Sequence, residues 1–480
     1  MATVPTVRLP LLNKLLYASD SLGSSAINQT RNLWLLFFLV PPVTSDLPSV
    51  IPPLDLGFLY LGPRVFAGIV LTAGRIIEAF DDPVIGWWSD RTQSRWGRRI
   101  PFVMFSTPFY ALFFTLLWLN PGNHASLGNA AYLFVIMQLF YLAGTLSSGP
   151  FEALFPEIAR THHDRISVVA WKFYFGLLGA ALGLVVTGFI KDAFGFGTMG
   201  IMVAVLLLVF RYVGLGGIWR HAPRHTPLAT VGLGKAFKHT LGNKQFLYFL
   251  PSFVLFQTAV GMVIGWLPFL VVAVIDEGGG GSGTSLLTGA AMAAMVVSVL
   301  VLWRLCNTKG KSWVYSACLL ASSLCMPPLF FAGFIPGIPA LPQALVLAAI
   351  AGAPMAGVFL LPGALTADIT DYDELRTGMR REGMFYAAQN LFEKIAGSFS
   401  PLLLALILSL GETREDPLGI RLVGPVAGAI TFGGFWLFRG YKLPSTVTRE
   451  TVRAAGLEVL PGGMGPDSPL SSDGDGDSGK

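Results

Sequence analysis

Residues 64–99 read RVFAGIVLTAGRIIEAFDDPVIGWWSDRTQSRWGRR, an apolar run of membrane-spanning length that ends in a short basic segment. In a helix, Arg75, Glu78 and Asp82 fall at positions i, i+3 and i+7 and share one face, while Asp81 is turned about 100° aside. An ionisable side chain at the centre of a membrane helix costs roughly 2.5–3.5 kcal/mol on insertion scales. Three such residues on one face therefore predict a polar site inside the membrane.

The composition of the whole chain indicates a membrane protein. Of the 480 residues, 53% are hydrophobic and 13% are charged, against about 25% charged in soluble domains. The three cysteines form neither a disulfide framework nor a metal-ligand pattern. The sequence has no HExxH, GxSxG or P-loop motif, so we expect neither an enzyme nor a bound cofactor or resident metal.

Apolar stretches long enough to cross a bilayer recur along the chain. The first is too long for a signal peptide and holds Asp20 and Arg31, so we expect it to be retained. The sequence predicts an all-α, multi-pass integral membrane protein with twelve transmembrane helices, located in the plasma (inner) membrane. The predicted spans are 12–40, 58–88, 100–120, 130–156, 167–190, 197–219, 246–275, 285–304, 312–334, 341–368, 384–410 and 418–438.

Lys and Arg in the connecting segments predict the orientation. With both termini inside (N-in/C-in), the inner segments hold 24 Lys and Arg residues, whereas the outer segments hold only Lys191, Arg414 and Arg421. We assign the net charge of +5 to contact with anionic lipids at the inner surface, and expect no nucleic-acid partner. The sequence carries no signal for the oligomeric state.

The longest inner loop, residues 220–245, divides the chain into two six-helix halves, 1–219 and 246–440. A basic, glycine-containing loop recurs after the second span (residues 88–99) and after the eighth (303–311), as expected for two related bundles. The tail, residues 441–480, is rich in Gly, Asp and Ser toward its end, so we predict that it is disordered.

Carboxylates one helical turn apart, as Glu78 and Asp82 are, can bind a small hard cation or share a proton. The alternative is that intramembrane charges only pair with one another to hold helices together. We favour that alternative, or snorkelling, for residues near span ends: Arg64, Glu157, Arg211 and Asp368. For Asp81, which precedes Pro83, both interpretations stay open. After the second span, Asp90, Arg91, Arg98 and Arg99 are expected to form a gating loop that contacts the second half.

Two long segments resemble one family. Residues 75–99 are similar to the second-helix signature of the melibiose-carrier-type sugar:cation symporters, the glycoside–pentoside–hexuronide:cation branch of the major facilitator superfamily. Residues 367–394, ADITDYDELRTGMRREGMFYAAQNLFEK, resemble the second signature of the same family. In the first helix, Tyr17, Asp20 and Gly23 fit as well. This resemblance implies the major facilitator fold.

The resemblance also implies a site for the coupling cation, Na⁺, Li⁺ or H⁺, at Glu78 and Asp82, completed by Thr145 of the fourth helix. Arg75 and Lys394 match charged positions near this site, and Asp81 is assigned to the same charge network.

On the substrate side, the resemblance implies that Asp20 accepts hydrogen bonds from sugar hydroxyls and that Lys172 stands about where the family has a sugar-contacting Arg. The sequence departs from the family on the fourth helix, because Ser148 replaces a second sugar-binding Asp and Glu152 replaces a stacking aromatic residue. Glu152 could supply the missing carboxylate, or it could pair with Lys172.

Three functions follow as hypotheses. The first is cation-coupled symport of a sugar or glycoside by alternating access, in which the cation neutralises the carboxylates before the two bundles rock about the site. The second is cation-coupled transport of a lysolipid or other amphiphile on the same scaffold. The third is a non-transporting sensor, which the retained intramembrane charges disfavour.

Overall fold

The computed structural model describes residues 9–459 except 46, 93, 120–123, 160, 222–239, 276–279, 379–380, 412, 414 and 445. The side chains of Asp82 and Asp90 lie outside the described residues, although both positions are within a helix.

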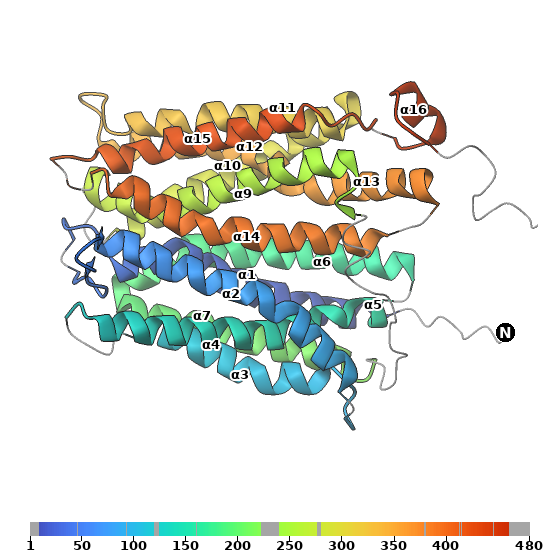
Figure 1. The fold of residues 1–480 in the computed structure, drawn as a ribbon, viewed down its shortest axis with the longest axis horizontal. Coiled ribbons are helices and arrows are strands. Elements are labelled where there is room, and N and C mark those ends of the chain that lie inside the picture. The colour runs from blue at the N-terminus through green and yellow to red at the C-terminus, as the bar shows by residue number, and fades with distance from the viewer. Residues whose placement is uncertain are drawn as a thin grey trace, which may run out of the picture.

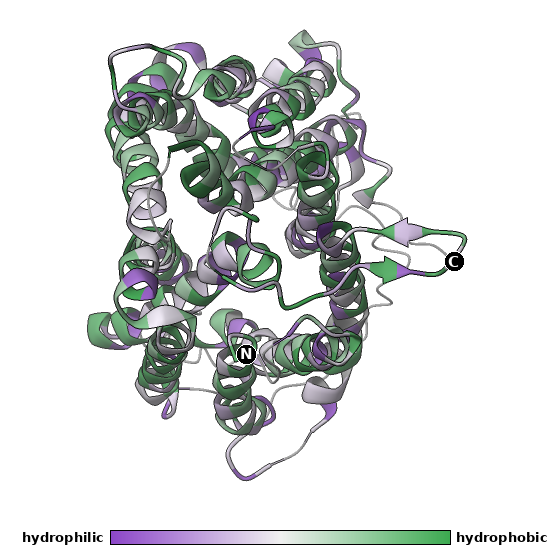
Figure 2. Cartoon of the chain, turned by 90° about the vertical axis from the view of Figure 1, so that its left-hand side faces the viewer, coloured by the Kyte–Doolittle hydropathy of each residue, from purple (hydrophilic) through white to green (hydrophobic). Residues whose placement is uncertain are grey.

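The described chain is almost entirely helical. Its helices are α1 (Leu11–Leu39), α2 (Pro63–Arg91), α3 (Ile100–Leu116), α4 (Leu127–Ala153), α5 (Phe155–Ile158), α6 (His162–Ala181), η1 (Leu182–Val186), α7 (Thr187–Ile218), α9 (Lys244–Leu270), η2 (Val271–Ile275), α10 (Gly281–Lys309), α11 (Lys311–Cys325), η3 (Pro327–Phe331), α12 (Ala340–Leu360), α13 (Pro362–Thr377), α14 (Glu382–Leu408), α15 (Leu418–Phe438) and α16 (Arg449–Ala454). A two-stranded hairpin of β1 (Leu54–Asp55) and β2 (Tyr60–Leu61) projects from the helices (Figure 2).

Helix boundaries follow local chemistry. The side chains of Ser126 and Asn243 accept hydrogen bonds from the first turns of α4 and α9, which satisfies backbone N–H groups that have no partner inside the helix. Gly195 has φ 80° and ψ 173°, so the continuous run from η1 into α7 is broken there. Pro362 stands in the first turn of α13, where the missing N–H costs nothing.

Among the described residues, eight helical stretches are long and apolar enough to cross a membrane. Large apolar side chains such as those of Val297, Leu300 and Trp303 on α10 are exposed, as expected where a helix faces lipid rather than water. Figure 2 shows hydrophobic residues along most helices. These features confirm the prediction of an integral, multi-pass membrane protein.

The helices pack mainly within two groups. Helix α1 packs against α6 and α7, and α3 packs against α4 and α7; in the second group, α9 packs against α14 and α15, and α10 against α12. Helices α3 and α4 lie at the bottom of Figure 1, and α11 and α15 at the top. The principal contacts between the groups join α2 to α14, α1 to α9 and α7 to α10.

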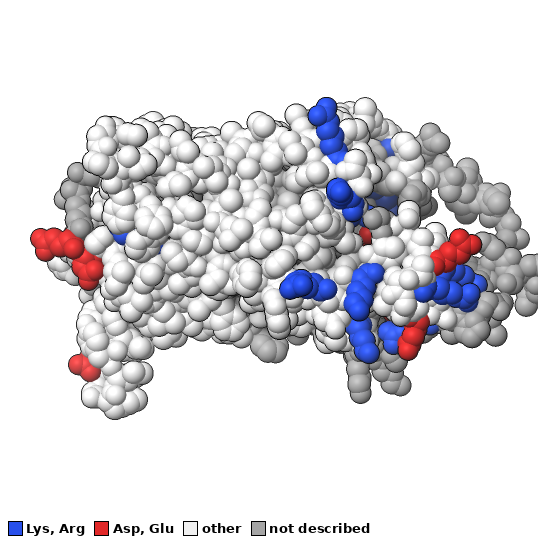
Figure 3. Space-filling view, turned by 90° about the horizontal axis from the view of Figure 1, so that it is seen from above, with Lys and Arg blue, Asp and Glu red and all other residues white. Residues whose placement is uncertain are grey.

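Charge is unevenly distributed along the long axis. On the face shown in Figure 3, Lys and Arg side chains gather toward the right-hand end, which in Figure 1 carries α13 and α16. This is the end at which the sequence predicts the basic inner loops.

The start of the tail is ordered, which corrects the prediction of disorder for residues 441–459. Helix α16 begins with a capping box between Thr448 and Thr451. Val452 of α16 is fully buried, and Tyr441 and Leu443 are also buried, so apolar contact with the bundle holds this segment. Residues 460–480 lie outside the described part of the chain.

Candidate functional site

Glu78 lies on α2 and forms an ion pair with Lys394 of α14, with 3.4 Å between Glu78 Oε1 and Lys394 Nζ. The two helices belong to different groups, so the pair crosses the interface between them. The Glu78 side chain is 18% exposed and that of Lys394 is 37% exposed, so a small cation can reach the carboxylate. Asp82, the second predicted cation ligand, lies two turns beyond Arg75 on the same helix, and its side chain is outside the described residues.

Thr145, the third predicted cation ligand, lies on α4. Its Oγ1 atom is buried and has no hydrogen-bond partner among the described residues, although α4 packs directly against α2. A buried hydroxyl that lacks a partner usually costs about 1–3 kcal/mol. The Thr145 hydroxyl oxygen has the chemistry of a ligand for a hard cation, so it fits the predicted cation site, and its role there stays a prediction.

Arg75 also bridges the two groups. It donates hydrogen bonds to the Gly397 carbonyl oxygen on α14 and, at 3.5 Å, to Asn32 Oδ1 on α1. One turn away, Thr72 donates to the Ser398 carbonyl oxygen at 2.8 Å. Asp81, which the sequence assigned to the same charge network, is partly buried on α2.

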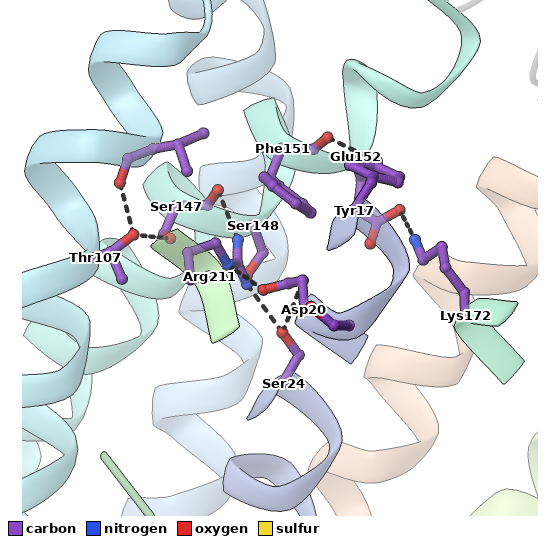
Figure 4. A network of polar contacts seen from close by, with 12 residues as sticks. Tyr17, Asp20, Ser24, Thr107, Ser147, Ser148, Phe151, Glu152, Lys172 and Arg211 are labelled. Carbon is purple, nitrogen blue, oxygen red and sulfur yellow. Dashed lines mark hydrogen bonds and ion pairs between the residues drawn. The ribbon is translucent and has the colours of Figure 1, made fainter. Parts of the chain in front are cut away.

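Asp20 is placed differently from the expectation that it faces a sugar. Its Oδ1 atom lies 2.5 Å from Nε of Arg211 on α7, and the two side chains are only 2% and 1% exposed. Arg211 also donates to the Ser147 carbonyl oxygen at 3.0 Å, to Ser24 Oγ at 2.9 Å and to Ser148 Oγ at 3.1 Å (Figure 4). Asp20 and Ser148, both predicted substrate ligands, are therefore engaged in a buried network inside the first group of helices.

Glu152 and Lys172 form the pair that the sequence left as an alternative. Lys172 Nζ of α6 donates to Glu152 Oε2 of α4, and the Glu152 side chain stays 53% exposed while that of Lys172 is 21% exposed. The Lys172 ammonium lies 5.7 Å from the ring centroid of Tyr17, whose hydroxyl donates to the Phe151 carbonyl oxygen (Figure 4). Both side chains are therefore accessible to a ligand.

The predicted gating loop contacts its own half in this structure. Arg98 and Arg99 both pair with Glu157 of α5, and Arg99 also donates to the Ala153 carbonyl oxygen. Arg91 is exposed at the end of α2, and the side chain of Asp90 lies outside the described residues. Arg98 and Arg99 thus bind Glu157, which the sequence predicted to serve helix pairing or snorkelling, and their expected contact with the second half stays a prediction.

At the opposite end, α7 and α10 meet closely. Asp192 of α7 accepts hydrogen bonds from the backbone N–H groups of Gly281 at 3.1 Å and Ser282 at 2.6 Å, the first two residues of α10. Lys191 Nζ lies 2.9 Å from Asp192 Oδ1. We call these four residues the α7–α10 clasp. A Cβ atom at Gly188 would stand 2.3 Å from the Gly281 carbonyl oxygen, so only glycine permits this approach.

Comparison with known proteins identifies the family. Residues 56–419 match the family model described as MFS/sugar transport protein. The chain belongs to the glycoside–pentoside–hexuronide:cation symporter family.

This symporter is 27% identical to the uncharacterized symporter sll1374 of Synechocystis sp., over 92% of the chain and 95% of that protein. It is 32% identical to sodium-dependent lysophosphatidylcholine symporter 1 of Xenopus tropicalis, but over only 26% of the chain and 24% of that protein. Its fold is similar to that of a mutant form of the nucleoside transporter NupG, with a TM-score of 0.64 over 90% of the chain and 100% of NupG, at 12% identity. The predicted family and the major facilitator superfamily are confirmed.

Sequence reasoning assigned Arg211 to helix pairing or snorkelling, and its ion pair with Asp20 confirms helix pairing. It missed Arg31, which was noted only as evidence against a signal peptide, yet is 7% exposed on α1. The available signal was an ionisable residue inside an apolar stretch.

Proposed function

We propose that the chain is a cation-coupled symporter that moves a sugar or glycoside by alternating access. The observation that carries this proposal is the Glu78–Lys394 pair, which joins the two helix groups inside the membrane. A cation that binds Glu78 weakens its attraction to Lys394 and so changes the interface on which the halves move.

Twelve crossings in two six-helix bundles fit the helices best. The stretch His163–Ile218 has 56 residues, far more than the roughly 20 that one crossing needs, and its break at Gly195 divides it into two crossings. The eight apolar stretches then supply nine crossings, and α1, α2 and α3 bring the total to twelve. An even number puts both termini on one side, and the basic end in Figure 3 supports the N-in/C-in orientation.

In this structure, the two halves are closed against each other at the outer end of the helices. Contacts between the halves cluster there, including the α7–α10 clasp and the approach of Gly68 on α2 to Leu402 and Ala405 on α14. The inner-end ion pairs described for this chain stay within one half: Lys14–Asp164, Arg98–Glu157, Arg99–Glu157, Lys311–Asp368 and Arg381–Asp373. In this proposal, transport opens the clasp and closes the inner end in alternation.

The coupling cation is Na⁺, Li⁺ or H⁺, bound by Glu78 with Asp82 and Thr145 as further ligands. Carboxylate and hydroxyl oxygens suit a hard cation, and two carboxylates one turn apart can instead share a proton. Without the cation, Lys394 offsets the charge of Glu78 alone. A charged Asp82 would then remain uncompensated, which opposes movement of a carrier that holds only the solute.

The amphiphile alternative is supported by one observation on the substrate side. The Asp20 carboxylate, the expected sugar acceptor, forms an ion pair with Arg211 and is 2% exposed. The lysophosphatidylcholine symporter that resembles part of this chain is consistent with a lysolipid substrate.

Uptake by proteoliposomes tests the proposal. Purified protein is offered radiolabelled glycosides and lysolipids with inward gradients of Na⁺, Li⁺ or H⁺. We expect accumulation of a glycoside that requires one of the gradients. Gradient-dependent accumulation of lysolipids alone supports the amphiphile alternative, and gradient-independent flux of every solute refutes symport.

A further inference from the structure

Arg31 on α1 is a buried cation without a carboxylate partner among the described residues. It is 7% exposed, and its guanidinium lies 5.3 Å from the ring centroid of Tyr141 and 5.7 Å from that of Phe140. Its hydrogen bond is to Asn32 Oδ1, at a long 3.4 Å. Aromatic faces and an amide oxygen stabilise a cation without neutralising it, so the charge of Arg31 is uncompensated within the described part of the chain.

Arg75 on α2 reaches the same oxygen. Its second guanidinium nitrogen lies 3.5 Å from Asn32 Oδ1, so two like charges converge on one neutral acceptor. Like charges repel strongly in a low-dielectric interior. Two guanidinium groups around one oxygen atom are the arrangement with which proteins bind a carboxylate or phosphate group.

The described carboxylates near the two arginines have other partners or lie far along a helix. Glu78 is paired with Lys394 and Asp20 with Arg211. Glu393, which interacts electrostatically with Arg75, accepts a hydrogen bond from Gln257 at 3.0 Å. By the helix rise of 1.5 Å per residue, Asp20 stands about 16 Å from Arg31 along α1. The contrast with Arg211 is informative, because that buried arginine does have a carboxylate at 2.5 Å.

The two arginines also lie where the halves meet. Arg75 donates to the Gly397 carbonyl oxygen of α14, and a Cβ atom at Gly265 of α9 would stand 3.3 Å from the Asn32 carbonyl oxygen. Arg31 keeps 7% of its surface accessible. A ligand held between Arg31 and Arg75 would therefore sit at the moving interface.

We infer that Arg31 and Arg75 form a subsite for an anionic group of the transported solute, a carboxylate or a phosphate. The inference rests on the proposed transport function and names the class of its substrate. An anionic oxygen replaces Asn32 Oδ1 between the two guanidiniums and draws Arg75 away from Gly397. Solute binding thereby loosens a contact between the halves, as cation binding does at Glu78.

Matched solutes test the subsite. Binding to the purified full chain is measured by titration calorimetry with methyl β-glucoside, methyl β-glucuronide, glucose 6-phosphate and lysophosphatidylglycerol, and thermal stability is measured with inorganic phosphate. We expect at least one anionic solute to bind the wild type about tenfold more tightly than the neutral glucoside, since one charged hydrogen bond supplies that factor. The two sugar anions and the lysolipid separate a soluble anion from a lipid phosphate as the natural source.

Variants assign the effect to the subsite. In Arg31→Gln the preference for the anion should fall to about threefold or less, whereas Arg31→Lys should retain most of it. Arg421→Gln is the control, because Arg421 also binds backbone carbonyls and an aromatic ring, at Phe330, Ala332 and Phe334.

The inference is overturned if the wild type binds the neutral glucoside as tightly as, or more tightly than, every anionic solute. It is also overturned by an anion preference that survives in a folded Arg31→Gln protein, or by the absence of any response to all the anions. Cation-coupled uptake of the neutral glucoside refutes the subsite and leaves the proposed function intact. Binding of an anion that depends on Arg31, without any cation-coupled uptake, supports the subsite and refutes the proposed function.

Discussion

The Asp20–Arg211 pair makes a quantitative prediction about stability. Both side chains are at most 2% exposed and their charged atoms are 2.5 Å apart. Removing one partner of a buried pair leaves the other charge uncompensated, which typically costs about 3–5 kcal/mol. We therefore expect Asp20→Asn and Arg211→Met each to lower the free energy of unfolding by about 3–5 kcal/mol.

The double variant separates pairing from other losses. Because neither charge is then left alone, Asp20→Asn combined with Arg211→Met should cost less than the more harmful single substitution. The assay is reversible unfolding in mixed detergent micelles with increasing dodecyl sulfate. The matched control is Glu152→Gln with Lys172→Met, since this pair is half-exposed and should contribute about 1 kcal/mol or less.

The opposite interpretation has a distinct signature. If Asp20 acts mainly as a substrate ligand, Asp20→Asn should weaken solute binding and change the unfolding free energy by less than about 1 kcal/mol. Additive losses in the double variant would likewise refute the buried pair as a stabilising unit.

The other predictions concern the transport cycle. Lys394→Met should impair coupled uptake more than membrane insertion, because it removes the partner of Glu78 across the interface; wild-type uptake would make Lys394 merely structural. Asp82→Asn should abolish cation-dependent accumulation while the protein still inserts, as measured by uptake alongside the amount of protein in the membrane. Asp192→Asn should weaken the clasp, because it removes the carboxylate that accepts hydrogen bonds from the first residues of α10. A carboxylate at a helix N-terminus contributes about 1 kcal/mol. A cysteine placed at buried Ala405 should therefore react with an impermeant thiol reagent from outside about fivefold faster in the Asp192→Asn protein than in the protein that keeps Asp192. Asp55→Asn, a surface carboxylate bonded within its own turn, should leave that rate unchanged, and equal rates in all three proteins would contradict a gating role for Asp192.

The helices could be predicted because apolar length and charge spacing are local properties. Helices cover most of each predicted span, and the period that puts Arg75, Glu78 and Asp82 on one face of α2 depends on that helix alone. The family resemblance connected Lys394 to the region of Glu78, with which it forms an ion pair, although no local pattern links the two. The assignment of Thr145 to the cation site stays a prediction.

Partners across helices could not be predicted in the same way. Asp20 and Arg211 are 191 positions apart, and which carboxylate meets which arginine depends on how α1 and α7 pack. The clasp depends on close contact of Gly188 with Gly281, and Asp192 is bound there by backbone N–H donors that every residue except proline carries. Helix α16 could not be predicted, because a few apolar residues in a polar tail do not show that they will be buried. In the structure Val452 is buried and holds the segment.

Binding of the coupling cation to Glu78 is the central claim, and it can be measured without knowing the solute. The measurement is the cation-dependent rise in thermal stability of the purified protein in Na⁺ and Li⁺ series and across pH, for wild type, Glu78→Gln and Glu152→Gln. We predict a saturable rise with one of these cations that is lost in Glu78→Gln and kept in Glu152→Gln. An identical cation response in wild type and Glu78→Gln would contradict the account.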